Sequence, residues 1–342
     1  MKPEHKLKIQ NILIITIIGL FFGLFYNYLF YEHTITEFAE AGSIGILLGV
    51  IVGVIEQFVL LRFFMKKTFL FVTFIRSALY AIITALVLSS VLSIEISFVE
   101  NISYRDAWME YLHSKFFIRD LLFTSALVLV MLLSLEIILL IGKLNFLRLI
   151  FGWYHQPSEV SRVFMFVDLK GSTSLAEKLS NKEYSAFIRD YFYDISDAIA
   201  MFGGEIYQYV GDEIVVVWKF KKDNSNCVKS FFKMKEIIEE KSKNYIRKFG
   251  FVPEFKAGIH SGKVIATQVG KIKKELVYHG DVLNTAARIE GQCNPLKESL
   301  LISENIKESL SSNNVFSIME KGAIPLRGKK QSLILFAVST NV

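Results

Sequence analysis

The first half of the chain consists of long apolar stretches separated by short polar connections. The stretches cover residues 11–31, 43–64, 69–94 and 121–142. Each has about 20 residues or more, enough for a helix to cross the ~30 Å hydrocarbon core of a bilayer. We therefore predict a membrane domain in residues 1–142, built as a four-helix α transmembrane bundle.

The second half has shorter apolar runs that alternate with amphipathic helical patterns. Residues 162–168 read as a buried strand, and residues 183–202 place their apolar side chains on one helical face. Tight turns at 211–212 and 261–262 indicate two β-hairpins. The predicted order is β-α-α-β-β-α-β-β-α-β. It favours an α+β fold of the ferredoxin-like kind with its helices on one face of the sheet.

The two halves are joined by residues 143–158. Residues 143–154 have the pattern of a short amphipathic helix, and Pro157 and Ser158 then end it. We predict that this juxtamembrane segment couples the membrane domain to a catalytic domain in residues 159–342.

Composition agrees with a membrane protein that has a soluble part. The chain is 52% hydrophobic and only 21% charged, with a mean hydropathy of +0.39. Two cysteines exclude a disulfide framework. The net charge of +6 is spread along the whole chain, so we expect no nucleic-acid partner.

The polar connections predict the orientation of the bundle. Basic residues gather in segments 2–8, 62–67 and 143–148, whereas segments 32–42 and 95–116 are mainly acidic. The positive-inside rule then places both termini in the cytoplasm. We expect a multi-pass protein of the inner (cytoplasmic) membrane, with the lipid bilayer as a partner.

Three ionisable residues, Glu56, Arg76 and Glu136, fall within the predicted spans. Charge inside a membrane is unfavourable and frequently functional. One hypothesis is that Arg76 pairs with Glu56 or Glu136 inside the bundle and tunes a signal. The alternative is that Arg76 snorkels to the inner end and that the two glutamates, near helix ends, have no such role.

Candidate chemistry begins with two aspartates. Asp168 ends a buried strand and Asp212 lies at a hairpin tip, so the carboxylates converge if those strands are neighbours. Two carboxylates without a histidine suit Mg²⁺ or Mn²⁺. Gly171, Ser172 and Thr173 follow at a helix start, where free N–H groups bind anions. The combination suggests two-metal phosphoryl chemistry on a nucleotide. The alternative is that Asp168 only caps a helix and Asp212 only makes a turn.

Four motifs resemble the catalytic domain of the class III adenylate/guanylate cyclase family. They are VFMFVDLKGST at 163–173, YQYVGDE at 207–213, GIHSGKV at 258–264 and HGDVLNTAARIE at 279–290. They occur in the family's order. The resemblance covers roughly residues 160–340 and is to the bacterial membrane-anchored type.

The resemblance implies roles for individual residues. Asp168 and Asp212, with the backbone of Leu169, match the positions that hold two Mg²⁺ or Mn²⁺ per site. Asn284 and Arg288 match an Asn-x-x-x-Arg pair on a helix. In the family the asparagine orients the ribose, and the arginine stabilises charge on the phosphate in the transition state.

A basic segment near the C-terminus is less specific. Arg327 and Lys329 resemble a family segment that contacts the terminal phosphates, although an exposed basic turn is the alternative reading. Arg288 also has a second reading, as a surface ion-pair partner of Glu290 or Asp281.

The resemblance further implies a homodimer with two equivalent sites, because the family builds each site from both chains. The positions that select the base hold Gln208 and Val277, which is neither the usual adenine pair nor the usual guanine pair. Gln can both donate to and accept from a base edge. Gln208 also resembles bacterial members that make cyclic AMP, so ATP is the expected substrate.

The expected function is therefore a membrane-anchored adenylate cyclase, whose output the membrane domain could set. The alternatives are a guanylate cyclase, a non-catalytic nucleotide-binding receptor, and a transporter or channel with a regulatory domain. The membrane ligand or regulator is unknown. It would have to be lipid-like, bound within the bundle, or a neighbouring membrane protein.

Overall fold

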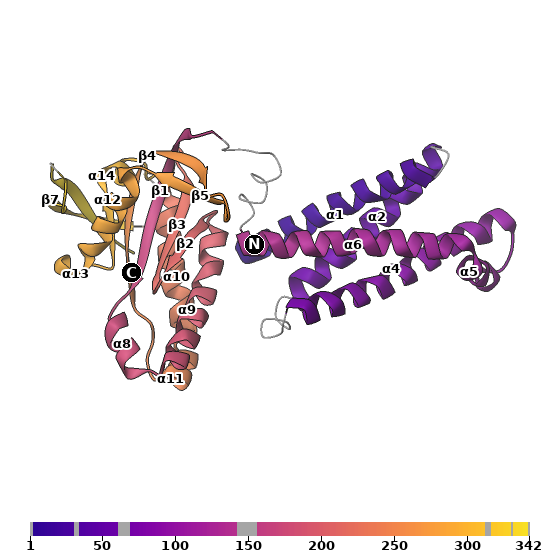
Figure 1. Ribbon diagram of the computed structural model, residues 1–342, viewed down its shortest axis with the longest axis horizontal. Coiled ribbons are helices and arrows are strands. Elements are labelled where there is room, and N and C mark those ends of the chain that lie inside the picture. The colour runs from indigo at the N-terminus through magenta and orange to yellow at the C-terminus, as the bar shows by residue number, and fades with distance from the viewer. Residues whose placement is uncertain are drawn as a thin grey trace. The chain divides into compact units, whose positions relative to one another are not determined.

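The structure is a computed structural model that describes residues 3–30, 34–60, 69–141, 156–311, 316–329 and 331–340. The chain divides into two compact units, Met1–Ile141 and Gly142–Val342 (Figure 1). The coupling helix expected within 143–158 lies, up to residue 155, outside the described residues.

The first unit is helical. Its elements are α1 (Pro3–Phe30), α2 (Ile35–Ile55), a π-helical turn η1 (Glu56–Leu60), α4 (Phe69–Glu100), α5 (Tyr104–His113) and α6 (Lys115–Ile141). Four of these helices are long and apolar enough to cross a membrane, as the sequence predicted.

The helices extend beyond the apolar stretches that predict them. The helix α2 begins at Ile35 and not near residue 43, because Thr34 and Glu37 form a capping box at its start. The helix α4 continues to Glu100, where Asn101 takes a left-handed conformation with φ of 55°. The helix α5, which lies between α4 and α6 in the chain, was not predicted. Backbone hydrogen bonds extend a helix through polar residues, so the apolar pattern marks only its membrane-spanning part.

Glycines allow α1 and α2 to pack closely. A Cβ atom at Gly19 would collide with the carbonyl oxygen of Gly45, and one at Gly45 would collide with that of Gly19. A Cβ at Gly49 would lie 2.7 Å from the Cα of Thr16. Small residues at such spacing let membrane helices approach to backbone contact.

The three ionisable residues singled out within the spans, Glu56, Arg76 and Glu136, form one cluster. The Arg76 guanidinium lies 2.7 Å from Glu136 Oε1 and 3.4 Å from Glu56 Oε2. The Tyr80 hydroxyl donates a hydrogen bond of 2.7 Å to Glu56. Arg76 therefore contacts both carboxylates inside the bundle. Whether the cluster tunes a signal stays a hypothesis.

The second unit is built on an eight-stranded sheet with the order β2-β3-β1-β4-β6-β8-β7, in which β5 pairs with β4. The strands are β1 (Ser158–Leu169), β2 (Glu205–Val210), β3 (Glu213–Lys219), β4 (Phe255–Val269), β5 (Glu275–His279), β6 (Leu300–Ser303), β7 (Phe316–Ile324) and β8 (Leu333–Thr340). The helices are α8 (Ser172–Lys178), α9 (Asn181–Met201), α10 (Ser225–Glu240), α11 (Ser242–Phe249), α12 (Asp281–Gly291), α13 (Cys293–Leu296) and α14 (Glu304–Glu308).

Helices cover both faces of this sheet, so the predicted one-sided arrangement was wrong (Figure 1). Along β1, Val163, Met165 and Val167 join the core that contains α9 and α10. The alternate residues Phe164 and Phe166 pack in a second core with α12. A strand buried on both sides reads as a continuous apolar run, which does not reveal how many layers cover it.

The predicted hairpin at Ser261-Gly262 is also absent, because β4 runs straight through it and pairs with β1. The two glycines of this segment serve helix packing. A Cβ at Gly258 would collide with the backbone of Glu290, and one at Gly262 would lie 2.7 Å from a methyl group of Val282. Both contacts are with α12, which can therefore lie directly on β4.

Candidate active site

Asp168 and Asp212 come together at one edge of the sheet. Asp168 lies at the end of β1, and Asp212 lies in the two-residue turn between β2 and β3. Gly211, the other turn residue, has a φ of +64° that favours glycine. Because β1 and β3 are antiparallel neighbours, the end of one lies beside the start of the other. The two carboxylates lie close enough for the charge of Asp212 to raise the pKa of Asp168.

Lys256 lies beside this pair, and sequence reasoning did not single it out. It faces Asp168 in the register of β4 on β1, and its Nζ lies 3.0 Å from Asp168 Oδ2. The same ammonium group contacts Glu290 of α12. Lys256 is 6% exposed and Glu290 is 7% exposed. The sequence did contain a signal for Lys256: it is a lysine within an apolar strand, and a buried charge requires a partner of opposite charge.

The local charge balance is negative. Burial raises the pKa of Asp168, Lys256 opposes this rise, and the charge of Asp212 adds to it. Burial and three neighbouring carboxylates raise the pKa of Glu213 to about 7. Burial would lower the pKa of Lys256, but its hydrogen bonds to Glu290 and Asp168 raise it above its usual value. The ammonium group therefore stays charged among several carboxylates.

The expected phosphate loop follows Asp168 directly. Leu169 is buried, and Gly171 has a φ of +70° as the N-cap of the short helix α8. No side chain caps this helix start, and Ser172 and Thr173 are its first two residues. Backbone N–H groups in such a position are available to an anion.

Asn284 and Arg288 lie four residues apart on α12. Asn284 is exposed and Arg288 is half-buried. Within the described part of the chain, Arg288 Nη1 is buried without a hydrogen-bond partner. Glu290 contacts Lys256 and Asp281 contacts Lys329, but the charge of Arg288 also helps to lower the pKa of Asp281, so the reading of Arg288 as a partner of Asp281 stays open.

The basic segment near the C-terminus packs against α12. A Cβ at Gly328 would lie 3.3 Å from Arg288 Nη2, so the turn and the guanidinium touch. Lys329 forms an ion pair with Asp281 at the start of α12, whereas Arg327 is exposed. Lys329 therefore lies beside α12, the helix that carries Arg288.

The two positions expected to select the base lie on strands whose tyrosines touch. Gln208 is exposed on β2, and Val277 is half-buried on β5. Their neighbours Tyr207 and Tyr278 touch, with ring centroids 5.2 Å apart, and Tyr278 N–H donates to the Tyr207 hydroxyl.

The expected site residues therefore fall into two groups. Asp168, Asp212 and the start of α8 form the first, and α12 with the 327–329 turn forms the second. Glu290 of α12 links them through Lys256 to Asp168. A cluster of carboxylates beside the unpartnered Arg288 Nη1 atom and the free backbone N–H groups of α8 suits a polyphosphate with its cations.

The sequence profile of the adenylate and guanylate cyclase catalytic domain matches residues 154–339. The chain belongs to the adenylate and guanylate cyclase family. The family assignment agrees with the class III resemblance of the four motifs and with the α+β fold predicted from them.

Individual relatives agree with this family. Adenylate cyclase 2 of Rhizobium meliloti (strain 1021) is 32% identical over 202 residues, which are 58% of this chain and 56% of the relative. An adenylate cyclase of Anabaena cylindrica is 28% identical over 181 residues, which are 51% of this chain and 36% of the relative. The matches therefore span only part of each relative's length.

A solved structure shows the same fold. A bacterial light-regulated adenylyl cyclase superposes with a TM-score of 0.54 at 18% identity. The match covers 63% of this chain and 64% of the other.

Proposed function

We propose that the chain is a membrane-anchored adenylate cyclase that converts ATP to 3′,5′-cyclic AMP and pyrophosphate. The observation that carries the proposal is the convergence of the Asp168 and Asp212 carboxylates at one edge of the sheet, in a chain of the cyclase family. The relatives named adenylate cyclase support the choice of ATP.

The residues at this edge fit divalent cations. Asp168, Asp212, Glu213 and Glu290 cluster around a single ammonium group, that of Lys256, so the edge has negative charge in excess. All these donors are oxygens, which Mg²⁺ and Mn²⁺ prefer. Among the described residues no group of three carboxylate, histidine or cysteine side chains could hold a metal ion by itself. Asp168, Asp212 and the Leu169 carbonyl would hold two cations together with the nucleotide phosphates.

The reaction forms one P–O bond and breaks another. The ribose 3′-oxygen attacks the α-phosphorus, its proton is lost, and the bond to the bridging oxygen breaks so that pyrophosphate leaves. Two bound cations would favour the 3′-alkoxide and neutralise charge on the triphosphate.

The chain's own residues would position and stabilise the reacting groups. Arg288, with an uncommitted Nη1, would donate to the oxygens on which charge develops. Asn284 would orient the ribose from one turn away on the same face of α12. The N–H groups at the start of α8 and the side chain of Lys329 would hold the phosphates.

We place the active site between two copies of the chain. Each chain has the aspartate pair once and the Asn284–Arg288 pair once. The strand β2 lies at the sheet edge next to the Asp212 turn, and there Tyr209 and Val210 are each about half exposed. Apolar side chains at an open edge support a face that a second copy covers.

Gln208 would read the base. Its amide can accept from the adenine amino group and donate to the adjacent ring nitrogen, whereas Val277 offers only an apolar contact. The catalytic unit would lie on the cytoplasmic side of the cell membrane, where the basic connections of the bundle also lie. Residues 143–158 would couple the two units.

The direct test is nucleotide turnover by the full-length protein in membranes, with Mn²⁺ and either ATP or GTP. We expect cyclic AMP from ATP, abolished by Asp212→Asn and unchanged by Glu239→Gln, a charge-matched change at an exposed position of α10. Arg288→Ala should lower the rate about 10²–10³-fold. Cyclic GMP from GTP would reassign the base, and no cyclic product from either nucleotide would reject the proposal.

A further inference from the structure

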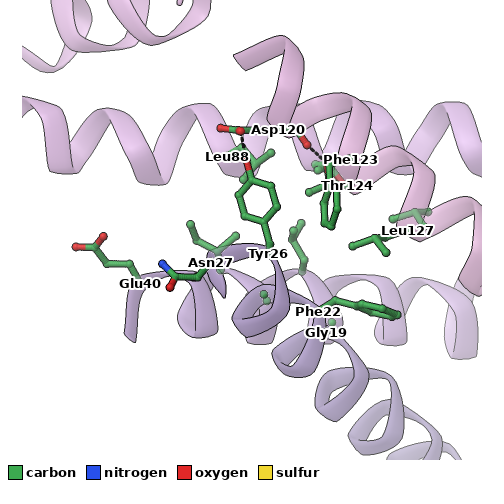
Figure 2. A pocket seen from close by; sticks show the side chains of 18 of the residues that line it. Gly19, Phe22, Tyr26, Asn27, Glu40, Leu88, Asp120, Phe123, Thr124 and Leu127 are labelled. Carbon is green, nitrogen blue, oxygen red and sulfur yellow. Dashed lines mark hydrogen bonds between the residues drawn. The ribbon is translucent and has the colours of Figure 1, made fainter. Parts of the chain in front are cut away.

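The membrane unit contains a partly open cavity of about 230 Å³ between α1, α2, α4 and α6 (Figure 2). Much of its wall is apolar and includes Ile15, Phe22, Leu88, Leu127 and Val128. A cavity of about 150 Å³ is large enough to hold benzene. This one therefore has room for a larger organic molecule.

One end of the cavity is polar. Asn27 lies near the end of α1, Glu37 and Glu40 near the start of α2, Glu95 near the end of α4, and Asp120 near the start of α6. These positions belong to the end of the bundle that carries α5 (Figure 1). It is the end opposite to Pro3 and Ile141, and thus opposite to the connection with the catalytic unit.

The carboxylates at this end differ in how their charge is satisfied. Asp120 lies 2.9 Å from Arg119 and accepts hydrogen bonds from Tyr26 and Tyr111. The Tyr26–Asp120 bond is drawn in Figure 2. Glu37 accepts from the backbone N–H of Thr34 as part of the α2 cap.

Glu40 and Glu95 are placed differently. Both line the polar end of the cavity close to each other, and Glu37 lies close enough to Glu95 to add its charge. In the part of the chain that the structure describes, no lysine or arginine forms an ion pair with either of them. The pair is therefore a carboxylate site without a protein cation.

Asn27 gives an independent indication of a ligand. It lines the cavity and is only 1% exposed, and its Oδ1 atom has no hydrogen-bond partner among the described residues. A buried acceptor without a donor is unfavourable, and a donor from a bound molecule would remove that penalty.

We infer that this cavity binds a small amphiphilic organic cation. Its ammonium group would donate to Glu40, Glu95 and the Asn27 carbonyl oxygen, and its apolar body would fill the space beside Leu88 and Leu127. A bare metal ion fits less well, because the described residues offer no three-ligand metal site and the rest of the wall is apolar. A fatty acid would bring a further carboxylate against Glu40 and Glu95, which like-charge repulsion disfavours.

One apolar core joins the cavity to the buried ion cluster. Ile15 and Val52 line it and belong to the same apolar core as Tyr80, the donor to Glu56. A molecule bound there would pack against the core that supports the Glu56–Arg76–Glu136 cluster. This inference does not rest on the proposed catalytic function.

Three probes with one carbon skeleton separate charge from apolar fit: 4-phenylbutylamine, 4-phenylbutanol and 4-phenylbutyrate. Calorimetric titration would use the full-length protein in phosphatidylcholine nanodiscs, with empty nanodiscs subtracted for partitioning. We expect saturable one-to-one binding of the amine, about tenfold tighter than that of the alcohol. The carboxylate probe should show no saturable binding.

Variants then locate the site. Glu40→Gln with Glu95→Gln should reduce amine affinity to that of the alcohol while alcohol binding persists, which shows that the fold is intact. Glu110→Gln, the same change at an exposed position of α5, should alter nothing. Leu127→Trp should abolish binding of both probes.

Three results would overturn the inference: equal affinity for amine and alcohol, an amine preference that survives the double substitution, and no saturable binding of any probe. Because no nucleotide is present, failure of the proposed cyclase activity would leave the outcome unaffected.

Discussion

Lys256 lies buried between Asp168 and Glu290, so replacing it with methionine keeps most of the side-chain volume and removes the cation. Glu290 then faces Asp168 without a partner, at 7% exposure. Breaking a buried ion pair in this way costs about 3–5 kcal/mol. Asp168 contributes the smaller part, because its side chain is 25% exposed and water can reach it.

The free-energy cost of leaving Glu290 buried without a cation cannot exceed the cost of protonating its carboxylate. Neutralising a carboxyl of ordinary pKa costs about 4 kcal/mol at pH 7 and about 1 kcal/mol at pH 5. In the variant the folded-state pKa of Glu290 lies above its unfolded value, so its contribution to stability is present at low pH and lost as pH rises. The deficit of Lys256→Met should therefore be large at pH 7 and small at pH 5.

The assay is thermal unfolding of the full-length protein in nanodiscs, without nucleotide or divalent cations. Trp218 is the reporter in β3, with Trp108 and Trp153 replaced by phenylalanine. For a unit of this size about 3 kcal/mol corresponds to a midpoint shift of about 10 °C. We expect that shift at pH 7, about half of it or less at pH 5, and recovery of most of it by adding Glu290→Gln. A midpoint at pH 7 within about 2 °C of the parent, or an equal deficit at both pH values, would refute the reasoning.

Two further predictions concern other buried polar groups. Glu56→Gln should destabilise the membrane unit by about 3 kcal/mol and Glu136→Gln by about 1 kcal/mol, because Glu56 also accepts from Tyr80; equal thermal midpoints in nanodiscs would contradict this. Burial, with the nearby charge of Lys329, lowers the pKa of His260 to about 4. Between its unfolded pKa of about 6.5 and pH 4 the unfolded chain therefore binds more protons, and stability falls as pH drops, by about 2 kcal/mol at pH 5. Hydrogen exchange of segment 255–262 should lose protection at pH 5 relative to His260→Gln, and identical protection in both proteins would exclude this effect.

Apolar length was enough to predict the membrane helices, because only a helix about 20 residues long satisfies its own backbone across a bilayer. It could not predict where the helices end. The caps at Thr34 and Asn101 are local backbone events outside the apolar stretches. It also gave no sign of the cavity, which depends on how four helices pack.

In the catalytic unit, the strand that ends at Asp168 and the hairpin at Asp212 followed from local pattern alone. The hairpin predicted at residues 261–262 was wrong. In sequence, a glycine that leaves room for a helix packed on the strand cannot be distinguished from a glycine in a turn. The role of Lys256 could not be predicted, since its two carboxylate partners lie far away in sequence and meet it only in the folded sheet.

The central claim is an adenylate cyclase site shared between two copies of the chain, and mixing two inactive variants tests it most directly. Asp212→Asn and Arg288→Ala would be co-expressed, purified as full-length protein in membranes, and assayed for cyclic AMP from ATP with Mn²⁺. In a one-to-one mixture about half the dimers contain both variants and restore one of two sites, so about a quarter of the wild-type activity should return. A mixture as inactive as each variant alone, beside an active wild-type protein, would contradict a shared site.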